Sequence, residues 1–219
     1  MCIRDRAGAA GGTRPRRVAR RPRGAGRHDP GPPGAGVIDA AVAGRIKLLG
    51  LDVDGVITNN AIYLGLVEGQ RIEFKQFDIQ DGLAMGLARR MGLLVAWVSG
   101  RYSDATTLRA TELRVDEVIQ DKGARKVPAM TEMLLRRGIG WDEVAFLGDD
   151  LADIPVLRRV GLPLAVANAV DEVKRLAAYT TRASGGAGAV REAIELLLRA
   201  QGRWDDAVRV YLEDRGEQA

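Results

Sequence analysis

From residue 45 onward, the hydrophobic positions of the chain form short apolar runs that alternate with longer amphipathic stretches. Continuous apolar runs are typical of strands buried on both faces, and their alternation with helices predicts βαβ units around a parallel sheet. We therefore predict an open, Rossmann-like α/β fold with helices on both faces of the sheet. The predicted strands are 46–51, 93–98, 117–119, 144–147, 164–166 and 179–181, and the predicted helices are 83–91, 104–113, 127–137, 154–160, 170–177 and 189–200.

The segment between the first strand and the first helix breaks this alternation. Residues 56–80 lack helical periodicity but contain two strand-like runs, 61–64 and 71–75, with glycines between them. This pattern predicts a β-hairpin, which we call the flap. A flap this short cannot cover a site alone. We therefore expect a neighbouring copy of the chain to help exclude water, which favours an oligomer over a monomer.

The two ends of the chain differ from its middle. Residues 1–36 are rich in Gly, Pro, Ala and Arg and are predicted to be disordered. The first six residues also resemble a translated adapter sequence, so we assign this region no function. Residues 37–202 form the predicted domain, and 203–219 form a C-terminal tail that could pack on its own subunit or reach a neighbouring site. One helical face of this tail carries Trp204, Ala207, Val208, Tyr211 and Leu212.

Charge and composition exclude several classes of function. The net charge is +4, but nine Arg and two Asp give residues 1–36 a charge of +7, which leaves the remainder at −3. A mildly acidic domain argues against a nucleic-acid surface. The one cysteine, Cys2, and the one histidine, His28, lie outside the domain, which excludes a Cys/His zinc site and a Ser–His or Cys–His pair there. No apolar run reaches membrane-spanning length, and we expect a cytoplasmic protein without a membrane partner.

Carboxylates follow two of the predicted strands. Asp52 and Asp54 come after the first strand, and Asp149 and Asp150 come after the strand 144–147. Because the carboxyl ends of parallel strands meet at one edge of a sheet, these groups should converge. Clustered carboxylates repel one another unless a cation lies between them, and oxygen-only ligands suit Mg²⁺. The sequence therefore predicts a magnesium-dependent phosphoryl-transfer enzyme.

Each residue of the motif Asp52-Val53-Asp54-Gly55 can be given a role. Asp52 is the predicted nucleophile, forming an aspartyl-phosphate, and Asp54 is the predicted general acid and base. Gly55 would let backbone N–H groups approach the phosphate. Asp52 and Asp149 are the predicted side-chain ligands of Mg²⁺, with the backbone carbonyl of Asp54. The alternative is an ordinary turn at the end of a strand.

Two further segments are predicted to bind the phosphoryl group or support the metal. Ser99, Gly100 and Arg101 follow the strand 93–98, where the hydroxyl and the next N–H could hold a phosphoryl oxygen, although Ser99 could instead cap a helix. Asp150 and Asp153 are predicted to orient water or a lysine from behind the metal ligands, and the alternative for Asp153 is a helix N-cap.

A lysine is also needed to neutralise the phosphate and the nucleophile. Lys126, at the start of a predicted helix, is the candidate, and Lys122 and Arg125 are nearby competitors for the same role. A solvated surface charge is the alternative for Lys126.

In their order along the chain, these motifs resemble those of the haloacid dehalogenase-like phosphatases. Residues 51–56, the flap, 77–82 and 185–192 resemble the capless branch that includes the 3-deoxy-D-manno-octulosonate 8-phosphate (KDO 8-phosphate) phosphatases. The resemblance covers about 45–202. It implies magnesium-dependent hydrolysis of that sugar-acid phosphate, for lipopolysaccharide precursors, by a homotetramer in which the flaps pack together.

The chain departs from this family at two positions. Members often carry Arg where this chain has Gln80 and Ala187, so two cations that could recognise a sugar acid are missing. Arg101, Arg71 and Lys75 could replace them, although the last two, on the flap, are also typical of solvated charges. A phosphatase for another nonulosonate or small sugar phosphate is therefore one alternative. A non-catalytic oligomerisation module of the same fold is a separate alternative.

Overall fold

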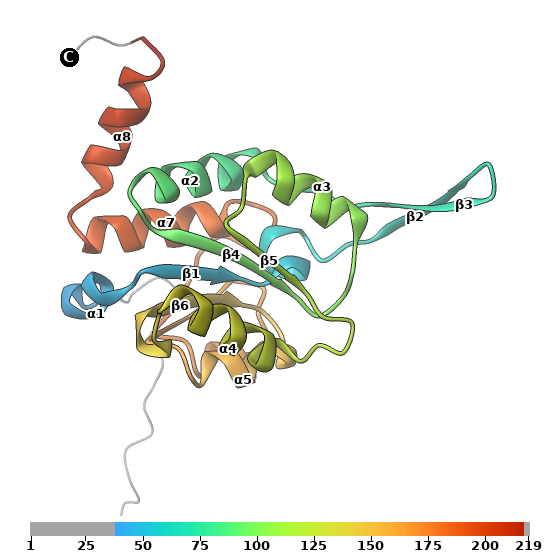
Figure 1. The fold of residues 1–219 in the computed structure, drawn as a ribbon, viewed down its shortest axis with the longest axis horizontal. Helices are drawn as coiled ribbons and strands as arrows, with labels where there is room; N and C mark the ends of the chain where they lie inside the picture. Colours follow the sequence, from blue (N-terminus) through green and yellow to red (C-terminus); the bar gives the residue numbers. More distant parts are fainter. Residues whose placement is uncertain (1–37, 217–219) are drawn as a thin grey trace, which may run out of the picture.

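The computed structural model describes residues 38–216 and contains a six-stranded parallel sheet in the order β5-β4-β1-β6-β7-β8 (Figure 1). The predicted Rossmann-like fold is confirmed, and each predicted strand is present with small shifts at its ends. The predicted disorder of residues 1–36 lies outside the described residues. The strands are β1 (Leu48–Leu51), β4 (Leu94–Ser99), β5 (Glu117–Gln120), β6 (Val144–Gly148), β7 (Leu162–Ala165) and β8 (Tyr179–Thr180).

The register of the central strands sets the position of the site. Leu51 at the end of β1 is level with Trp97 in β4 and with Leu147 in β6. The backbone N–H of Asp52 still bonds to the carbonyl of Leu147, at 3.0 Å. Strands β1 and β6 are buried along their whole length, so the residues that follow them start from fixed points at one edge of the sheet.

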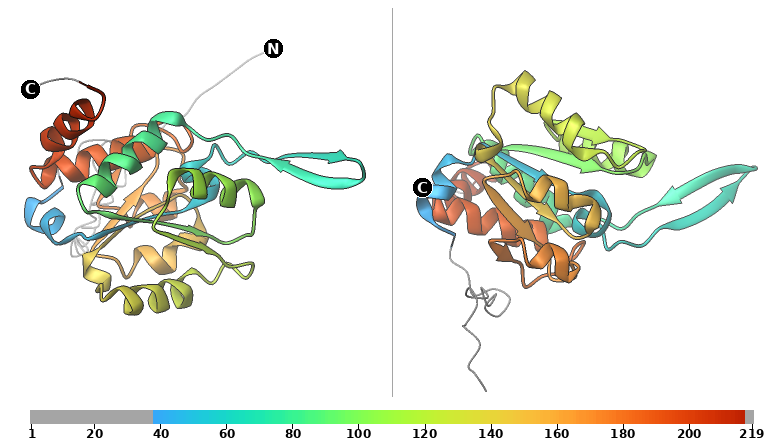
Figure 2. Two further views of the ribbon diagram at one scale, coloured as in Figure 1. Left: turned by 45° about the horizontal axis from the view of Figure 1, so that its top comes forward. Right: turned by 90° about the horizontal axis from the view of Figure 1, so that it is seen from below.

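Helices cover both faces of the sheet (Figures 1 and 2). One face carries α2 (Ile79–Arg90), α3 (Asp104–Leu113) and α7 (Ala189–Ala200), and the other carries α4 (Lys126–Arg137), α5 (Ile154–Leu157) and α6 (Asp171–Lys174). A short helix, α1 (Ala40–Arg45), precedes β1. In the described part of the chain, no helix combines the length and hydrophobicity needed to cross a bilayer.

The observed boundaries of helices α2, α5 and α6 differ from the predicted ones. Helix α2 begins at Ile79 rather than at residue 83, because the carboxylate of Asp78 accepts hydrogen bonds from the N–H groups of Gln80 and Asp81, at 2.7 and 3.1 Å. Helices α5 and α6 are shorter than predicted, with four residues each.

The predicted flap is present as an antiparallel hairpin of β2 (Tyr63–Val67) and β3 (Gln70–Phe74). It extends away from the body of the molecule (Figure 1). Unlike the central strands β1 and β6, it exposes large apolar side chains, namely Tyr63, Leu64, Leu66, Val67 and Phe74. Exposed apolar patches of this kind are typical of interaction surfaces.

The C-terminal helix α8 (Trp204–Glu213) packs on its own subunit, against α2 and α7. Trp204 and Ala207 are buried, and the guanidinium groups of Arg191 and Arg199 lie 5.0 and 5.4 Å from the centre of the Trp204 ring. Cation–π contacts on this ring add to the apolar packing. The first of the two predicted arrangements for the tail is therefore the one seen for residues 204–213.

Candidate active site

The loop after β1 brings the nucleophile motif against the loop after β6. Residues Val53–Ile57 form a wide turn in which Gly55 has φ of 101°. A Cβ atom at Gly55 would overlap the carboxylate of Asp149. The carbonyl of Gly55 accepts a hydrogen bond of 3.2 Å from the amide of Asn168. Both the backbone conformation and the contact with Asp149 therefore require glycine at this position.

Lys126 lies at the centre of the site. It is only 4% exposed, and its ammonium forms ion pairs with Asp52 and, at 2.6 Å, with Asp153. Of the two competing cations, Arg125 points outward to Asp121 and Lys122 lies over the ring of Tyr102. The structure therefore brings Lys126, and neither competitor, to the predicted nucleophile.

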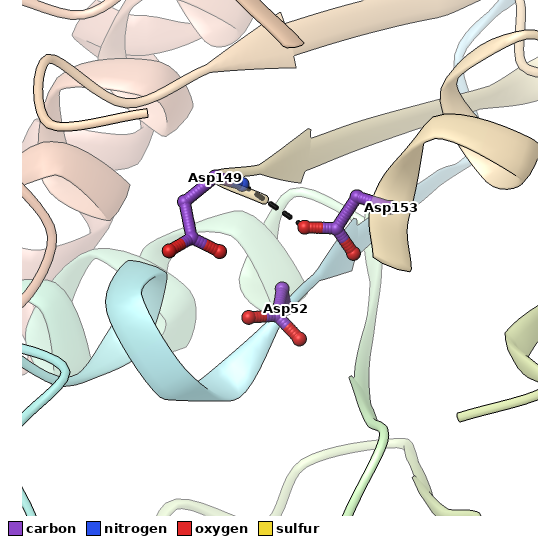
Figure 3. A group of neighbouring side chains, drawn as sticks. All are labelled: Asp52, Asp149 and Asp153. Carbon is purple, nitrogen blue, oxygen red and sulfur yellow. Dashed lines mark hydrogen bonds between the residues drawn. The ribbon is translucent and has the colours of Figure 1, made fainter. Parts of the chain in front are cut away.

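Asp153 fixes the loop after β6 (Figure 3). While one carboxylate oxygen holds Lys126, the other accepts hydrogen bonds from the N–H groups of Asp149, at 3.0 Å, and Asp150, at 3.4 Å. Its side chain makes no N-cap hydrogen bond to α5. The carboxylate of Asp150 points to the N–H of Leu151 at the surface. Asp153 thus supports Lys126 from behind, while Asp150 contributes to the turn.

The carboxylates of this site resist ionisation. Burial, reinforced by Asp153, raises the pKa of Asp52 well above its usual range, and Lys126 only partly offsets this. Burial and the charges of Asp153 and Asp150 raise the pKa of Asp149 to about 7. Burial alone would lower the pKa of Lys126, but the adjacent Asp52 and Asp153 outweigh it and raise that pKa. Negative charge therefore exceeds positive charge in this buried space.

This arrangement fits a divalent cation. Oxygen atoms of Asp52, Asp149 and Asp153 all lie within 4.8 Å of one another, and all three side chains are buried (Figure 3). Both carboxylate oxygens of Asp153 already have partners, which leaves Asp52 and Asp149 to hold the ion. Because their donors are oxygens only, the site suits Mg²⁺. We call Asp52, Lys126, Asp149 and Asp153 the buried cluster.

The carboxylate of Asp54 contacts the flap and the loop after β4. Its Oδ1 lies 2.7 Å from Nζ of Lys75, and its Oδ2 lies 3.4 Å from Nε of Arg101. The Lys75 side chain has no exposed surface, so the interpretation of Lys75 as a solvated charge is wrong. Glu73 on β3 accepts hydrogen bonds from the Arg101 guanidinium at 2.9–3.2 Å. We call Glu73 and Lys75 the flap root.

The loop after β4 closes the third side of the site. The hydroxyl of Ser99 is buried and accepts a hydrogen bond of 3.2 Å from the N–H of Arg101. Helix α3 is capped by Ser103 instead, whose hydroxyl accepts from Thr106. The N-cap alternative for Ser99 is therefore wrong. A cavity of about 210 Å³ opens between the three loops, lined by Asp52, Asp54, Asn60, Ser99, Gly100, Arg101, Lys126, Asp149, Asp150, Ala152 and Asp153.

Comparison with known proteins decides the family. A sequence profile described as haloacid dehalogenase-like hydrolase matches residues 96–194. The 3-deoxy-D-manno-octulosonate 8-phosphate phosphatase KdsC of Escherichia coli K12 is 40% identical over 177 residues, which cover 81% of this chain and 91% of that protein. The chain belongs to the haloacid dehalogenase-like hydrolases.

Solved structures of similar enzymes have the same fold as this hydrolase. The KDO 8-phosphate phosphatase of Moraxella catarrhalis, in complex with magnesium ion, phosphate ion and a KDO molecule, is 33% identical with a TM-score of 0.72, covering 78% of this chain and 97% of the other. The corresponding phosphatase of Yersinia pestis is 37% identical with a TM-score of 0.71, covering 76% and 88%.

Two contributors to the site of this hydrolase were missed by sequence reasoning. Glu73 lies in the flap, where a charged residue alternating with apolar ones indicates a solvated strand face. Asn168 lies beyond β7, and its amide oxygen accepts from Gly185 while its NH₂ donates to Gly55. Asn168 thereby ties together two loops that are distant in sequence, and no local motif marks such a residue.

Proposed function

We propose that this hydrolase is a magnesium-dependent phosphatase that converts KDO 8-phosphate to KDO and inorganic phosphate. The observation that carries the proposal is the pairing of the Asp52 carboxylate with buried Lys126, beside Asp149, at the base of an open cavity. A phosphate placed there would meet a nucleophile and a cation together.

The chemistry divides into two steps. In the first, a carboxylate oxygen of Asp52 attacks phosphorus, the bond from phosphorus to the sugar oxygen breaks, and Asp54 gives its proton to that oxygen. In the second, water attacks the aspartyl-phosphate and loses a proton to Asp54. The bond between Asp52 and phosphorus then breaks, which releases phosphate and restores the carboxylate of Asp52 and the protonated carboxyl group of Asp54.

The surrounding groups stabilise charge during both steps. Lys126 balances the charge of Asp52 and of the phosphoryl oxygens, and Asp153 holds Lys126 in position. The hydroxyl of Ser99 and the N–H of Gly100 are proposed to hold a phosphoryl oxygen, and Gly55 leaves room for it. A magnesium ion bound by Asp52 and Asp149 would supply Lewis-acid stabilisation of the phosphoryl group.

The sugar acid has space beside the phosphate. A second cavity of about 870 Å³ lies between the flap and α3 and shares Arg101 with the catalytic cavity. A phosphorylated sugar could therefore extend from the buried cluster toward the flap. The relatives named above support KDO 8-phosphate as the substrate, because they match this chain over nearly their whole length.

Gln80 and Ala187 favour a second candidate substrate. Both side chains are exposed, and neither provides the cation that family members often carry there. Weaker binding of the sugar carboxylate would favour another nonulosonate phosphate, or a small sugar phosphate, as the substrate. A non-catalytic module is disfavoured, because the paired Asp52 and Lys126 carry a desolvation cost that an oligomerisation role does not need.

A substrate panel tests this proposal. KDO 8-phosphate, other phosphorylated sugar acids and simple hexose phosphates are compared by kcat/KM with Mg²⁺, and again after chelation with EDTA. We expect KDO 8-phosphate to rank first and chelation to abolish turnover until Mg²⁺ is restored. Equal values for hexose phosphates would contradict the substrate but not the mechanism, and absence of turnover with every ester would contradict both.

The proposed assembly is a homotetramer, and the proposed location is the cytoplasm. Support for the tetramer comes from the flap, where Leu64, Leu66 and Val67 are 60%, 76% and 54% exposed. Covering such side chains with a second copy would stabilise the assembly by roughly 1.5–3 kcal/mol for each residue fully buried.

A further inference from the structure

Lys75 places a fully covered ammonium group against the proposed proton donor. Its side chain has 0% exposure, and its Nζ lies 2.7 Å from Oδ1 of Asp54 and 3.0 Å from Oγ1 of Thr106. An ammonium removed from water is costly unless oxygen atoms take its hydrogen bonds. Lys75 is therefore held in one position, unlike an ordinary charge on an exposed hairpin.

A second cation completes the surroundings of Asp54. The Nε of Arg101 lies 3.4 Å from Oδ2, so each oxygen of the carboxylate faces a cation from a different element. Glu73 connects the two sides, because it binds Arg101 and the hydroxyl of Ser103 and lies 3.9 Å from Lys75. The orientation of Asp54 is thus fixed jointly by the flap and by the loop after β4.

Of the two cations that contact the carboxylate of Asp54, Lys75 lies closer than Arg101. At 3.4 Å, the Arg101 contact is longer than an ordinary charge-assisted hydrogen bond, and the guanidinium is mainly engaged by Glu73. Oδ1 is therefore the anchored oxygen, and Oδ2 is the one more available to the catalytic cavity, which Asp54 lines. Lys126 cannot replace Lys75, since it is held by Asp52 and Asp153.

We propose that Lys75 is a positioning residue that holds Asp54 in place for proton transfer to the leaving sugar oxygen, which makes the flap root part of the catalytic centre. This inference rests on the proposed function, because it requires a leaving oxygen to protonate. The proton moves from the carboxyl group of Asp54 to the sugar oxygen as the bond to phosphorus breaks. Lys75 itself gains and loses no proton.

Two substrates separate this role from a purely structural one. A sugar alkoxide is a poor leaving group and needs the proton, whereas p-nitrophenolate leaves without one. For Lys75→Met we expect kcat/KM to fall by about 30-fold with the best sugar phosphate of the panel but by less than about threefold with p-nitrophenyl phosphate. Lys75→Arg, which keeps a cation, should recover most of the sugar phosphate activity.

Matched variants complete the design. Lys47→Met removes a lysine that is paired with Glu143 at the opposite end of β1, and it should leave both substrates unaffected. If Lys75→Met does not fold, Lys75→Gln removes the charge and keeps a group that can bond to Thr106. The double variant Asp54→Asn with Lys75→Met should be no slower than Asp54→Asn alone, because Lys75 acts through Asp54.

The outcomes are distinct. Equal losses of kcat/KM on the two substrates in Lys75→Met, or multiplied losses in the double variant, would overturn the role of Lys75 while leaving the phosphatase intact. Failure of the unmodified protein to hydrolyse any phosphate ester would overturn the proposed function instead.

Discussion

The buried cluster and the flap root both bring acidic and basic side chains together, but they are held by different means. Asp52, Lys126, Asp149 and Asp153 are each at most 6% exposed. They follow or face strands β1 and β6, which are buried throughout. The flap root lies at the end of β3, where the hairpin that extends away from the body begins (Figure 1), and its side chains form ion pairs with Asp54 and Arg101.

We infer from this difference that the buried cluster carries out the chemical steps and that the flap adjusts their rate. A residue fixed by the core of the domain cannot move without disturbing the sheet, so the buried cluster is suited to a constant task. A residue fixed by a few ion pairs on a hairpin can be moved by whatever contacts the hairpin. We therefore expect changes in the buried cluster to abolish turnover and changes in the flap to modify it.

The largest effect is expected for Asp52→Asn. An amide oxygen is a poor nucleophile, so kcat should fall by at least about 10⁴-fold with sugar phosphates and with p-nitrophenyl phosphate alike. Steady-state phosphate release checks this, with Asp121→Asn as the control, since Asp121 pairs with outward-pointing Arg125. Turnover at an undiminished rate in Asp52→Asn would refute the covalent mechanism and, with it, the contrast between cluster and flap.

The same difference explains what the sequence could predict. Strands 46–51 and 144–147 are mainly apolar, and aspartates follow each of them, so the fold and the convergence of Asp52 with Asp149 could be inferred from hydrophobic pattern and topology alone. Lys126 was proposed from the need for a cation and its place at the start of a helix, and the sequence left Lys122 and Arg125 as competitors.

Lys75 could not be predicted in this way. On an alternating hairpin, a lysine beside Phe74 has the pattern of a solvated side chain. Its burial depends on Thr106 and Asp54, which lie 31 residues later and 21 residues earlier in the chain. Contacts of this kind leave no periodic signal in the sequence.

A smaller effect is expected on the pH dependence of stability. Burial raises the pKa of Asp149 from 3.8 to about 7, so the folded state binds this proton more tightly than the unfolded state. Stability from this group is fully present below pH 3.8 and is lost as the pH rises to about 7, by roughly 2 kcal/mol once solvent screening is considered.

Urea unfolding of the metal-free protein between pH 4 and pH 8 measures this loss. Asp149→Asn should flatten the profile, and Asp150→Asn, which removes only a neighbouring negative charge, should flatten it less. Mg²⁺ should stabilise the unmodified protein more at pH 8 than at pH 5, because its ligands must be deprotonated. A free energy of unfolding that rises through this range in the metal-free protein would contradict the assigned environment of Asp149.

The smallest effect on turnover is expected from the tip of the flap. Leu66 is 76% exposed on β2, and we expect Leu66→Glu to place a charge in the proposed contact between flaps and to reduce the assembly below a tetramer. Leu135 on α4 is equally exposed, at 78%, but lies away from the flap, so Leu135→Glu should leave the mass unchanged. Light scattering coupled to size-exclusion chromatography distinguishes the two.

Because the buried cluster stays intact, kcat/KM for the sugar phosphate should fall by only about fivefold in Leu66→Glu, as the flap root loses its support and water enters the site. A tetramer that persists in Leu66→Glu would show that the flaps do not form the interface, and loss of turnover as complete as in Asp52→Asn would show that flap and cluster are not separable.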